Sequence, residues 1–340
     1  MSATIIARKL LDRALTPYGY RVVPNAVLHD WQKESDAKPR FNPTRLAAAS
    51  RNYLRPDHPR LLELRARYAR FDPRVTSPAV WTTGYVTTQD LLYFRGDNAY
   101  VWQLRGPNTD SSGYALATYY AKSIDALGLL SKLGEDDDFG NFTFEIAGRQ
   151  VSRDLLDSVI EIYFLERHLG LASSGREGTV LDIGAGYGRL AHRMLAALPN
   201  VRRYLCTDAV AESTFISEYY LRCRQVQDRA GVVPLDEIEA ALEAHPVDLA
   251  VNVHSFAECT LPAIDWWISL LARHRVKHLM VVPNAQDHGG TRLLSNRGGD
   301  MRAIIERHGY REIAKDPKYL DPLVQKHALM PTWHYLFELG

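Results

Sequence analysis

The sequence has little of what marks several large classes of protein. Its 340 residues include only three cysteines, Cys206, Cys223 and Cys259, which are odd in number and widely spaced. They fit neither a disulfide framework nor a zinc motif, and they agree with a reducing, cytoplasmic environment. The formal net charge is only +1, so composition gives no electrostatic reason to expect a nucleic acid or an acidic membrane as partner.

Long apolar runs, internal repeats and low-complexity segments are also missing. Residues 1–23 mix charged and apolar side chains without a sustained apolar core or a cleavage signal, so we expect neither a signal peptide nor a membrane span. A hydrophobic content of 46% and a charged content of 24% are typical of a globular protein. The length suggests two domains, or one domain with an extension.

The most informative stretch is Thr-Val-Leu-Asp-Ile-Gly-Ala-Gly-Tyr-Gly-Arg-Leu, residues 179–190. Its first five residues are typical of a buried parallel strand, and apolar residues at helical spacing follow the glycines. A ligand site is expected here because glycine lets the backbone approach a bound molecule and a helix N-terminus offers unpaired N–H groups. The candidate cofactor contacts are Asp182, Gly184, Ala185, Gly186 and Gly188.

Two classes of ligand use such a turn. Dinucleotide-binding folds require Gly-x-Gly-x-x-Gly to seat a pyrophosphate, whereas here the third glycine, Gly188, comes one residue early. The pattern Leu-Asp-Ile-Gly-Ala-Gly-Tyr-Gly resembles the first motif of the class I methyltransferases. That resemblance implies S-adenosylmethionine as the cofactor. An ordinary strand-to-helix turn that merely requires glycine is the alternative reading.

Strands and helices alternate after Gly175, which predicts an α/β fold with a doubly wound, Rossmann-like sheet. The class I resemblance likewise implies seven strands that end in a hairpin. We expect residues 175–340 to form the cofactor-binding catalytic domain and residues 1–174 a mainly helical extension that supplies a lid or substrate wall. The expected strands are 179–183, 204–208, 231–233, 247–253, 278–282, 310–315 and 333–339.

Ligands of open α/β sheets lie beyond the carboxyl ends of the strands. Asp208 ends the second strand, where a carboxylate can accept hydrogen bonds from ribose hydroxyls; its alternative role is to cap the next helix. Leu235 and Asp236 follow the third strand, where a backbone N–H and a carboxylate could hold an adenine ring. Asp236 is equally suited to be an N-cap.

The fourth strand ends in an unusual concentration of polar residues: Asn252, His254, Ser255 and Glu258 lie within seven positions. This Asn-x-His-Ser-Phe-x-Glu arrangement, together with Asp-Ser at 157–158 and Glu-Tyr-Tyr-Leu at 218–221, resembles a bacterial group of sugar O-methyltransferases. An overall resemblance to the methyltransferases of methylmannose polysaccharide synthesis implies a mannoside as acceptor. Cys259 departs from the group, in which methionine is expected at that position.

Methylation of a hydroxyl requires a base, because a protonated alcohol is a poor nucleophile. The candidates are His254 and Glu258, although the His254 ring could instead contact the cofactor or satisfy the core. His288, with Asp287 beside it, is a second candidate base, and the two could bind a divalent metal that holds sugar hydroxyls. The predicted partner is a sugar or glycoside, and a homodimer is an open alternative to a monomer.

Three segments of the extension carry further expectations. The aromatic stretch 81–102 is expected to build a core or a wall of the acceptor site. The basic helix 59–71 is expected to present a solvated face. The acidic run 135–138 lacks the spacing of a calcium loop and is expected to be solvated.

Overall fold

The computed structural model describes residues 7, 10, 11, 13–18, 20, 48–77, 79–82, 84–104, 109 and 111–340. Most of the N-terminal segment 1–23 discussed above lies outside these residues. Within the described ranges, no helix combines the length and the apolar character needed to cross a membrane.

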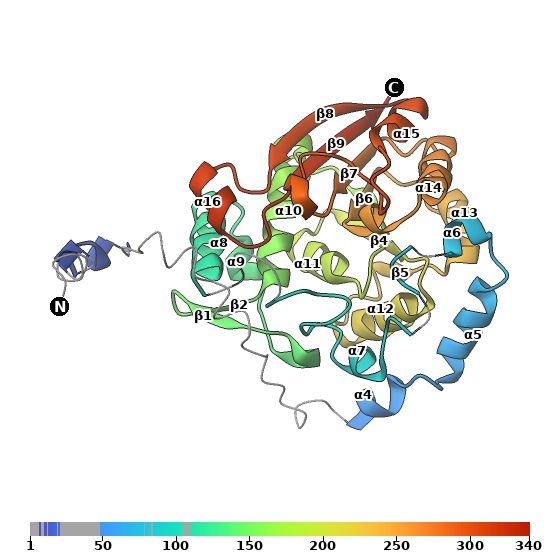
Figure 1. Ribbon diagram of the computed structural model, residues 1–340, viewed down its shortest axis with the longest axis horizontal. Coiled ribbons are helices and arrows are strands. Elements are labelled where there is room, and N and C mark those ends of the chain that lie inside the picture. The colour runs from blue at the N-terminus through green and yellow to red at the C-terminus, as the bar shows by residue number, and fades with distance from the viewer. Residues whose placement is uncertain are drawn as a thin grey trace.

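The centre of the molecule is a seven-stranded sheet of order β5-β4-β3-β6-β7-β9-β8 (Figure 1). Strands β5, β4, β3, β6 and β7 are parallel, and β9 is antiparallel to both of its neighbours. The predicted doubly wound sheet with a hairpin edge is therefore confirmed. The strands are β3 (Gly178–Ile183), β4 (Val201–Thr207), β5 (Ala230–Val232), β6 (Leu249–Val253), β7 (His278–Val282), β8 (Tyr310–Pro317) and β9 (Trp333–Leu339).

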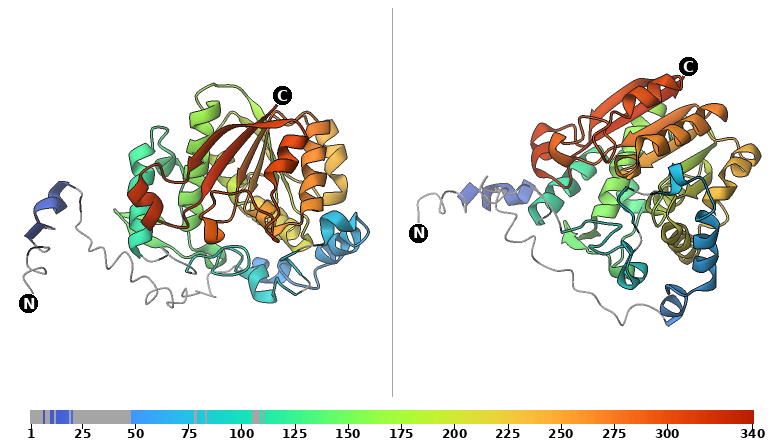
Figure 2. Two further views of the ribbon diagram at one scale, coloured as in Figure 1. Left: turned by 45° about the horizontal axis from the view of Figure 1, so that its top comes forward. Right: turned by 45° about the vertical axis from the view of Figure 1, so that its right-hand side comes forward.

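Helices cover both faces of this sheet (Figures 1 and 2). One face carries α10 (Arg153–Leu169), α11 (Arg189–Ala197) and α12 (Ala211–Cys223). The other carries α13 (Ile238–Ala244), α14 (Leu261–Arg273) and α15 (Arg302–Arg307). The chain runs outward from β3 through β4 to β5, then returns to pair β6 with β3 on the opposite side. This reversal between β3 and β6 is the switch point, where such sheets bind ligands.

Capping interactions define both ends of helix α10. The Ser152 hydroxyl accepts the Leu155 N–H at 3.1 Å, and Gly170, with φ 60°, ends the helix in the left-handed conformation. The sequence predicts a helix over 152–171, and the observed helix begins one residue later and ends two residues earlier. Because α10 packs against both α8 and α11, the polar residues of its first turns are held over the switch point.

The extension consists of short elements rather than one helical unit. Its single expected helix over 111–133 is two helices, because Gly128 adopts φ 65° and Asp125 accepts the Leu129 N–H at 2.6 Å. The elements are α4 (Ala48–Tyr53), α5 (Pro59–Tyr68), α6 (Pro73–Thr76), α7 (Thr88–Leu92), α8 (Ser111–Ile124), α9 (Leu129–Lys132), β1 (Phe144–Ile146) and β2 (Arg149–Val151). A further helix, α16 (Pro322–His327), precedes β9.

The prediction of a solvated face on the basic helix is confirmed only in part, because Leu62, Glu63 and Ala66 are exposed but basic side chains are bound elsewhere. The arginines of α5 form ion pairs with the sheet domain: Arg60 with Glu218 at 2.5 Å, Arg65 with Glu212 at 2.7 Å, and Arg67 with Asp236 at 2.8 Å. Partners so distant in sequence give no periodic signal, and the pairing fixes α5 along α12.

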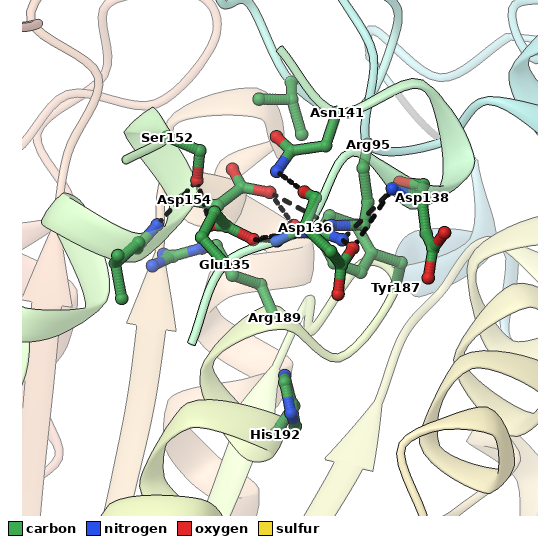
Figure 3. A network of polar contacts seen from close by, with 12 residues as sticks. Arg95, Glu135, Asp136, Asp138, Asn141, Ser152, Asp154, Tyr187, Arg189 and His192 are labelled. Atoms are coloured by element: carbon green, nitrogen blue, oxygen red, sulfur yellow. Dashed lines mark hydrogen bonds and ion pairs between the residues drawn. The ribbon is translucent and has the colours of Figure 1, made fainter. Parts of the chain in front are cut away.

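The acidic run is not solvated either, at least over its first half (Figure 3). The guanidinium of Arg95 is fully buried and pairs with Glu135 at 2.5 Å and with Asp136 at 2.6 Å. Glu135, whose side chain is also fully buried, binds Arg193 of α11 at 2.8 Å, and Asp136 binds Arg224, just after α12, at 2.6 Å. These arginines lower the pKa of both carboxyl groups against the opposing effect of burial. The extension and the sheet helices therefore share one buried ionic network.

Candidate active site

A cavity of about 180 Å³ lies at the carboxyl ends of β3, β4 and β6. The cavity therefore lies where the sequence predicts a ligand site, at the switch point of the sheet. Its walls come from the glycine turn, from α10, from α14 and from the extension. The side chains that argue for function are Trp81, Tyr100, Arg153, Asp154, Asp157, Asp182, Arg189, Asp208, His254, Glu258 and Trp267.

The three glycines of the turn have different tasks, although all adopt positive φ. A Cβ on Gly184 would lie 2.1 Å from the Ser255 hydroxyl, so this glycine is required by the neighbouring chain. Gly188 caps α11 and faces α12, and it does not line the cavity. A Cβ on Gly186 would meet only a Tyr100 ring carbon at 3.9 Å. Gly186 is therefore the glycine that leaves space for a ligand.

The N–H groups of the turn are already used inside the protein. Those of Gly184 and Ala185 donate to the Thr207 carbonyl at 2.9 and 3.1 Å. The Gly186 N–H donates to Asp208 Oδ2 at 3.0 Å, and Oδ1 of the same carboxylate accepts the Val210 N–H at 2.9 Å. A turn whose amides are bound to a carbonyl and a carboxylate is not a cradle for phosphate.

Asp182 and Asp208 are buried carboxyl groups that line the cavity. Burial raises the pKa of each to about 7. The Tyr204 hydroxyl, which donates to Asp182 at 3.0 Å, opposes the shift for Asp182. For Asp208, the N–H groups of Val210 and Gly186 oppose it, and the negative charge of Glu258 adds to it. Both groups are thus poised to ionise when a cation or a hydroxyl donor arrives.

The α10 side of the cavity carries charges of both signs. Asp157 pairs with Lys318 at 2.6 Å and with Arg153 at 3.1 Å. Arg189, the first residue of α11, binds Glu161 with both terminal nitrogens at 2.9 Å. The Tyr187 hydroxyl donates to Asp154. The sequence reasoning singled out only Asp157 among these, although Arg153, Asp154, Asp157 and Glu161 in an otherwise apolar helix are a signal that could have found them.

His254 follows β6 in a conformation that non-glycine residues rarely adopt, with φ 67° and ψ −31°. Its N–H donates to the Val282 carbonyl at 2.7 Å, whereas its buried ring atom Nδ1 has no partner among the described residues. Asn252 secures the turn by donating to the Ile183 carbonyl at 2.8 Å and accepting the Phe256 N–H at 2.9 Å. Burial lowers the pKa of His254 to about 3, so the imidazole is neutral at physiological pH.

Glu258, in the short helix η4 (Ser255–Glu258), has different interaction partners from His254. Its carboxylate accepts the Trp81 indole N–H at 2.6 Å, and its charge acts on Asp208. The charged groups that act on His254 are instead Arg153, Asp157, Arg189 and Lys318. Burial raises the pKa of Glu258, against hydrogen bonds from Trp81 and Asn284. Both predicted candidates line the cavity, but nothing in their contacts joins them.

Leu235, Asp236 and His288 do not line the cavity, and neither does Gly188. The Leu235 N–H donates to the Tyr68 hydroxyl at 3.0 Å, and Asp236 is held by Arg67. His288 belongs to η5 (Gln286–His288), together with Asp287. In the part of the chain that the structure describes, no three His, Cys, Asp or Glu side chains converge as a metal ion would require.

No protein-family model matches the chain, and no curated protein matches it. Among solved structures, the [4+2]-cyclase SpnF is similar over 67% of this chain and 93% of its own, at 16% identity and a TM-score of 0.39. The precorrin-6y C5,15-methyltransferase of Geobacter metallireducens is similar over 54% of this chain and 88% of its own, at 14% identity and a TM-score of 0.36. RosA, a riboflavin-derivative dimethyltransferase of Streptomyces davawensis, is similar over 55% of this chain and 58% of its own, at 16% identity and a TM-score of 0.36. Likeness at this level says nothing about activity, which has to be argued from the site.

Proposed function

We propose that the protein is an S-adenosylmethionine-dependent methyltransferase that acts on a hydroxyl of a sugar or glycoside. When bound, the cofactor supplies a methyl group on a positively charged sulfur. The chain itself has to bind that cation, align the acceptor with it and receive the acceptor's proton. Each task has candidate residues in the cavity.

The observation that carries the proposal is the hydrogen bond from the Gly186 N–H to Asp208 Oδ2 at 3.0 Å. It places a carboxylate at the point where a dinucleotide would need an anion-binding amide. A pyrophosphate there would meet a negative group, whereas a ribose would meet an acceptor for its hydroxyls. The bond therefore favours an adenosyl cofactor without phosphates over a nicotinamide dinucleotide.

The electrostatics of the cavity support a cationic ligand. Asp182, Asp208 and Glu258 accept hydrogen bonds from uncharged donors, and burial raises the pKa of all three. A positive charge nearby would stabilise their ionised forms. S-Adenosylmethionine brings two positive groups, the sulfonium and the ammonium, so its charge fits this set of carboxyl groups.

His254 is the better of the two candidate bases. Its imidazole is neutral at physiological pH, which is the state that accepts a proton, and its strained backbone is held in place by Asn252. Burial and the charges of Arg153, Arg189 and Lys318 lower the pKa of the ring, and the charge of Asp157 opposes them, which helps to stabilise the protonated product of the transfer. Glu258 remains the alternative, and His288 is less suited because it does not line the cavity.

The extension supplies a wall on which a sugar could pack. The rings of Trp81 and Tyr100 line the cavity with centroids 5.1 Å apart and an interplanar angle of 53°. An aromatic ring offers an apolar face to the C–H side of a sugar, and the carboxylate of Glu258 beside it accepts hydrogen bonds from hydroxyls. Metal assistance finds no support in the described side chains.

The test is a transfer assay with methyl-labelled S-adenosylmethionine and a panel of methyl glycosides that includes a mannoside. The proposal expects label in a glycoside and release of S-adenosylhomocysteine. Cofactor binding with no transfer to any acceptor class would indicate a binding module instead. Transfer to amines or nucleic acid, with none to glycosides, would show that the protein is a methyltransferase with a different class of acceptor.

A further inference from the structure

Strand β8 is an open edge of the central sheet. It stands last in the order β5-β4-β3-β6-β7-β9-β8, so β9 covers one of its edges and, within the described residues, no strand pairs with the other (Figure 1). The strand is eight residues long, Tyr310–Pro317, and it pairs with β9 along its whole length. An open edge presents unpaired N–H and C=O groups, which can pair with a strand of another chain.

Exposed apolar side chains gather at this edge. Among the described residues after position 119, the exposed large apolar side chains are Ile313, Leu320 and Leu323, at 46%, 46% and 56%. Ile313 lies on β8 itself, at a bulge that leaves it opposite no residue of β9. Leu320 and Leu323 follow within six residues of the end of the strand. Apolar groups gathered beside an open strand edge indicate a surface for a protein partner.

The charges of β8 match a second copy of the same strand. Residues 311–316 read Arg-Glu-Ile-Ala-Lys-Asp. If two such strands run antiparallel about a two-fold axis between positions 313 and 314, Arg311 of each copy lies opposite Asp316 of the other. Glu312 of each copy then lies opposite Lys315. Opposed residues of an antiparallel pair share a face of the sheet, where opposite charges stabilise the pairing.

We infer that the protein forms a homodimer in which β8 of one copy pairs antiparallel with β8 of the other. Charges on an edge strand discourage pairing with an arbitrary strand, but this order of charges permits one register. A shift of one residue in either direction opposes Arg311 to Lys315 or Glu312 to Asp316, which are like charges. A parallel pair in register opposes each charge to itself. The two-fold arrangement makes every contact twice, as a closed dimer requires.

Neighbouring elements extend the interface beyond the strand. Helices α15 and α16 lie at opposite ends of β8 (Figure 1), so the two-fold arrangement brings α16 of one copy, with its exposed Leu323, towards α15 of the other. A hollow beside the start of β8 is lined by Glu306 and Glu312. Arg302 pairs with both glutamates, which leaves one negative charge for Lys315 of the other copy. Strands β7 and β9 separate β8 from the cavity, so both cavities stay open in the dimer.

Sedimentation equilibrium of the full chain over a range of concentrations tests the inference, which expects twice the 38.5 kDa mass of one chain. Glu312→Lys opposes two cations across the interface and Lys315→Glu opposes two anions, so each change should raise the dissociation constant of the dimer by about tenfold or more. Mixed in equal amounts, the two variants should form a mixed dimer, because each supplies the charge that the other lacks. Glu239→Lys reverses a charge in an exposed ion pair of α13 and should leave the mass unchanged.

Circular dichroism of each variant checks its folding. If either charge reversal fails to fold, Ile313→Asp takes its place, since it brings two carboxylates together at the two-fold axis and should likewise give a monomer. Three results would overturn the inference: a monomeric unmutated chain at every concentration, a dimer that all these β8 variants leave intact, or two folded charge-reversal variants that stay monomeric when mixed.

Discussion

Asp208 at the end of β4 holds Gly186 of the glycine turn, through a hydrogen bond of 3.0 Å from the glycine N–H to the carboxylate. The same carboxylate binds the Val210 N–H, so it organises both the turn and the entrance to α12. The N-cap of α12 is Val210 and no side chain caps it, so Asp208 contacts the cap residue without being the cap, and its role beside a ribose stays a prediction. A carboxylate has about four acceptor positions, and these two bonds together with the Ser213 side chain use three of them.

Gly186→Ala tests whether the turn faces a ligand. Its Cβ would project into open space beside Tyr100, so we expect a folded protein with at least about tenfold weaker binding of S-adenosylhomocysteine. Gly175→Ala is a matched control, because Gly175 also has positive φ and no neighbour within 4 Å but does not line the cavity. Equal affinities in the two variants would remove Gly186 from the site.

Affinity for S-adenosylmethionine should rise with pH. The pKa of Asp208 is raised to about 7 in the protein alone, whereas the bound ligand favours the ionised form. Binding therefore releases a proton from Asp208 below pH 7, and this group contributes an increase in affinity of at most about tenfold per pH unit up to that point, before its contribution levels off. Calorimetry at pH 6 and pH 8 in two buffers measures both effects. Asp208→Asn should make the affinity less dependent on pH. An affinity that falls as pH rises would contradict the prediction.

His254→Ala and Glu258→Gln separate chemistry from binding. If His254 is the base, its removal should lower kcat by about 10²–10⁴-fold with little change in S-adenosylhomocysteine affinity. Glu258 is one of the three buried carboxyl groups proposed to face the positive charge of the cofactor, so Glu258→Gln should mainly weaken cofactor binding. Measuring kcat and cofactor affinity for both variants, with His288→Ala as a control outside the cavity, decides the roles. The opposite pattern, or loss of turnover only in His288→Ala, would move the base to another residue.

Arg95→Met tests the ionic network that joins the extension to the sheet helices. Removal of this fully buried guanidinium leaves Glu135 and Asp136 short of a partner, and breaking a buried pair costs about 3–5 kcal/mol. Arg273→Met is the control: it breaks a surface pair with Glu239, both more than half exposed, and costs about 0–1 kcal/mol. Urea unfolding of the full chain measures both. Equal midpoints would mean that the network does not stabilise the fold.

The sequence was sufficient where local pattern decides structure. The expected bounds of β7 and β9 match those observed, as does a helix predicted over 261–273, which is α14, because apolar period and flanking turn signals are both clear there. The glycine turn was also found, since its chemistry is contained in one short stretch. What the pattern did not reveal is that only Gly186 among the glycines opens onto a ligand space, because that depends on Ser255 and α12, which are far away in the chain.

Long-range pairing accounts for the other differences. Leu235 and Asp236 follow the third strand as expected, but Tyr68 and Arg67, more than 160 residues earlier, take their hydrogen bonds. His254 and Glu258 are neighbours in sequence, yet one lies among the charges of α10 and the other beside Trp81 and Asp208. Neither arrangement leaves a periodic trace, so sequence reasoning could locate the site without assigning its parts.

The most direct test of the account is the choice of cofactor by the unmutated protein. Calorimetric titration with S-adenosylhomocysteine, S-adenosylmethionine and NAD asks whether the turn, with its amides bound to Thr207 and Asp208, accepts an adenosyl amino acid or a dinucleotide. The account predicts saturable binding of both adenosyl ligands and none of NAD. Binding of NAD, with no heat from either adenosyl ligand, would contradict it.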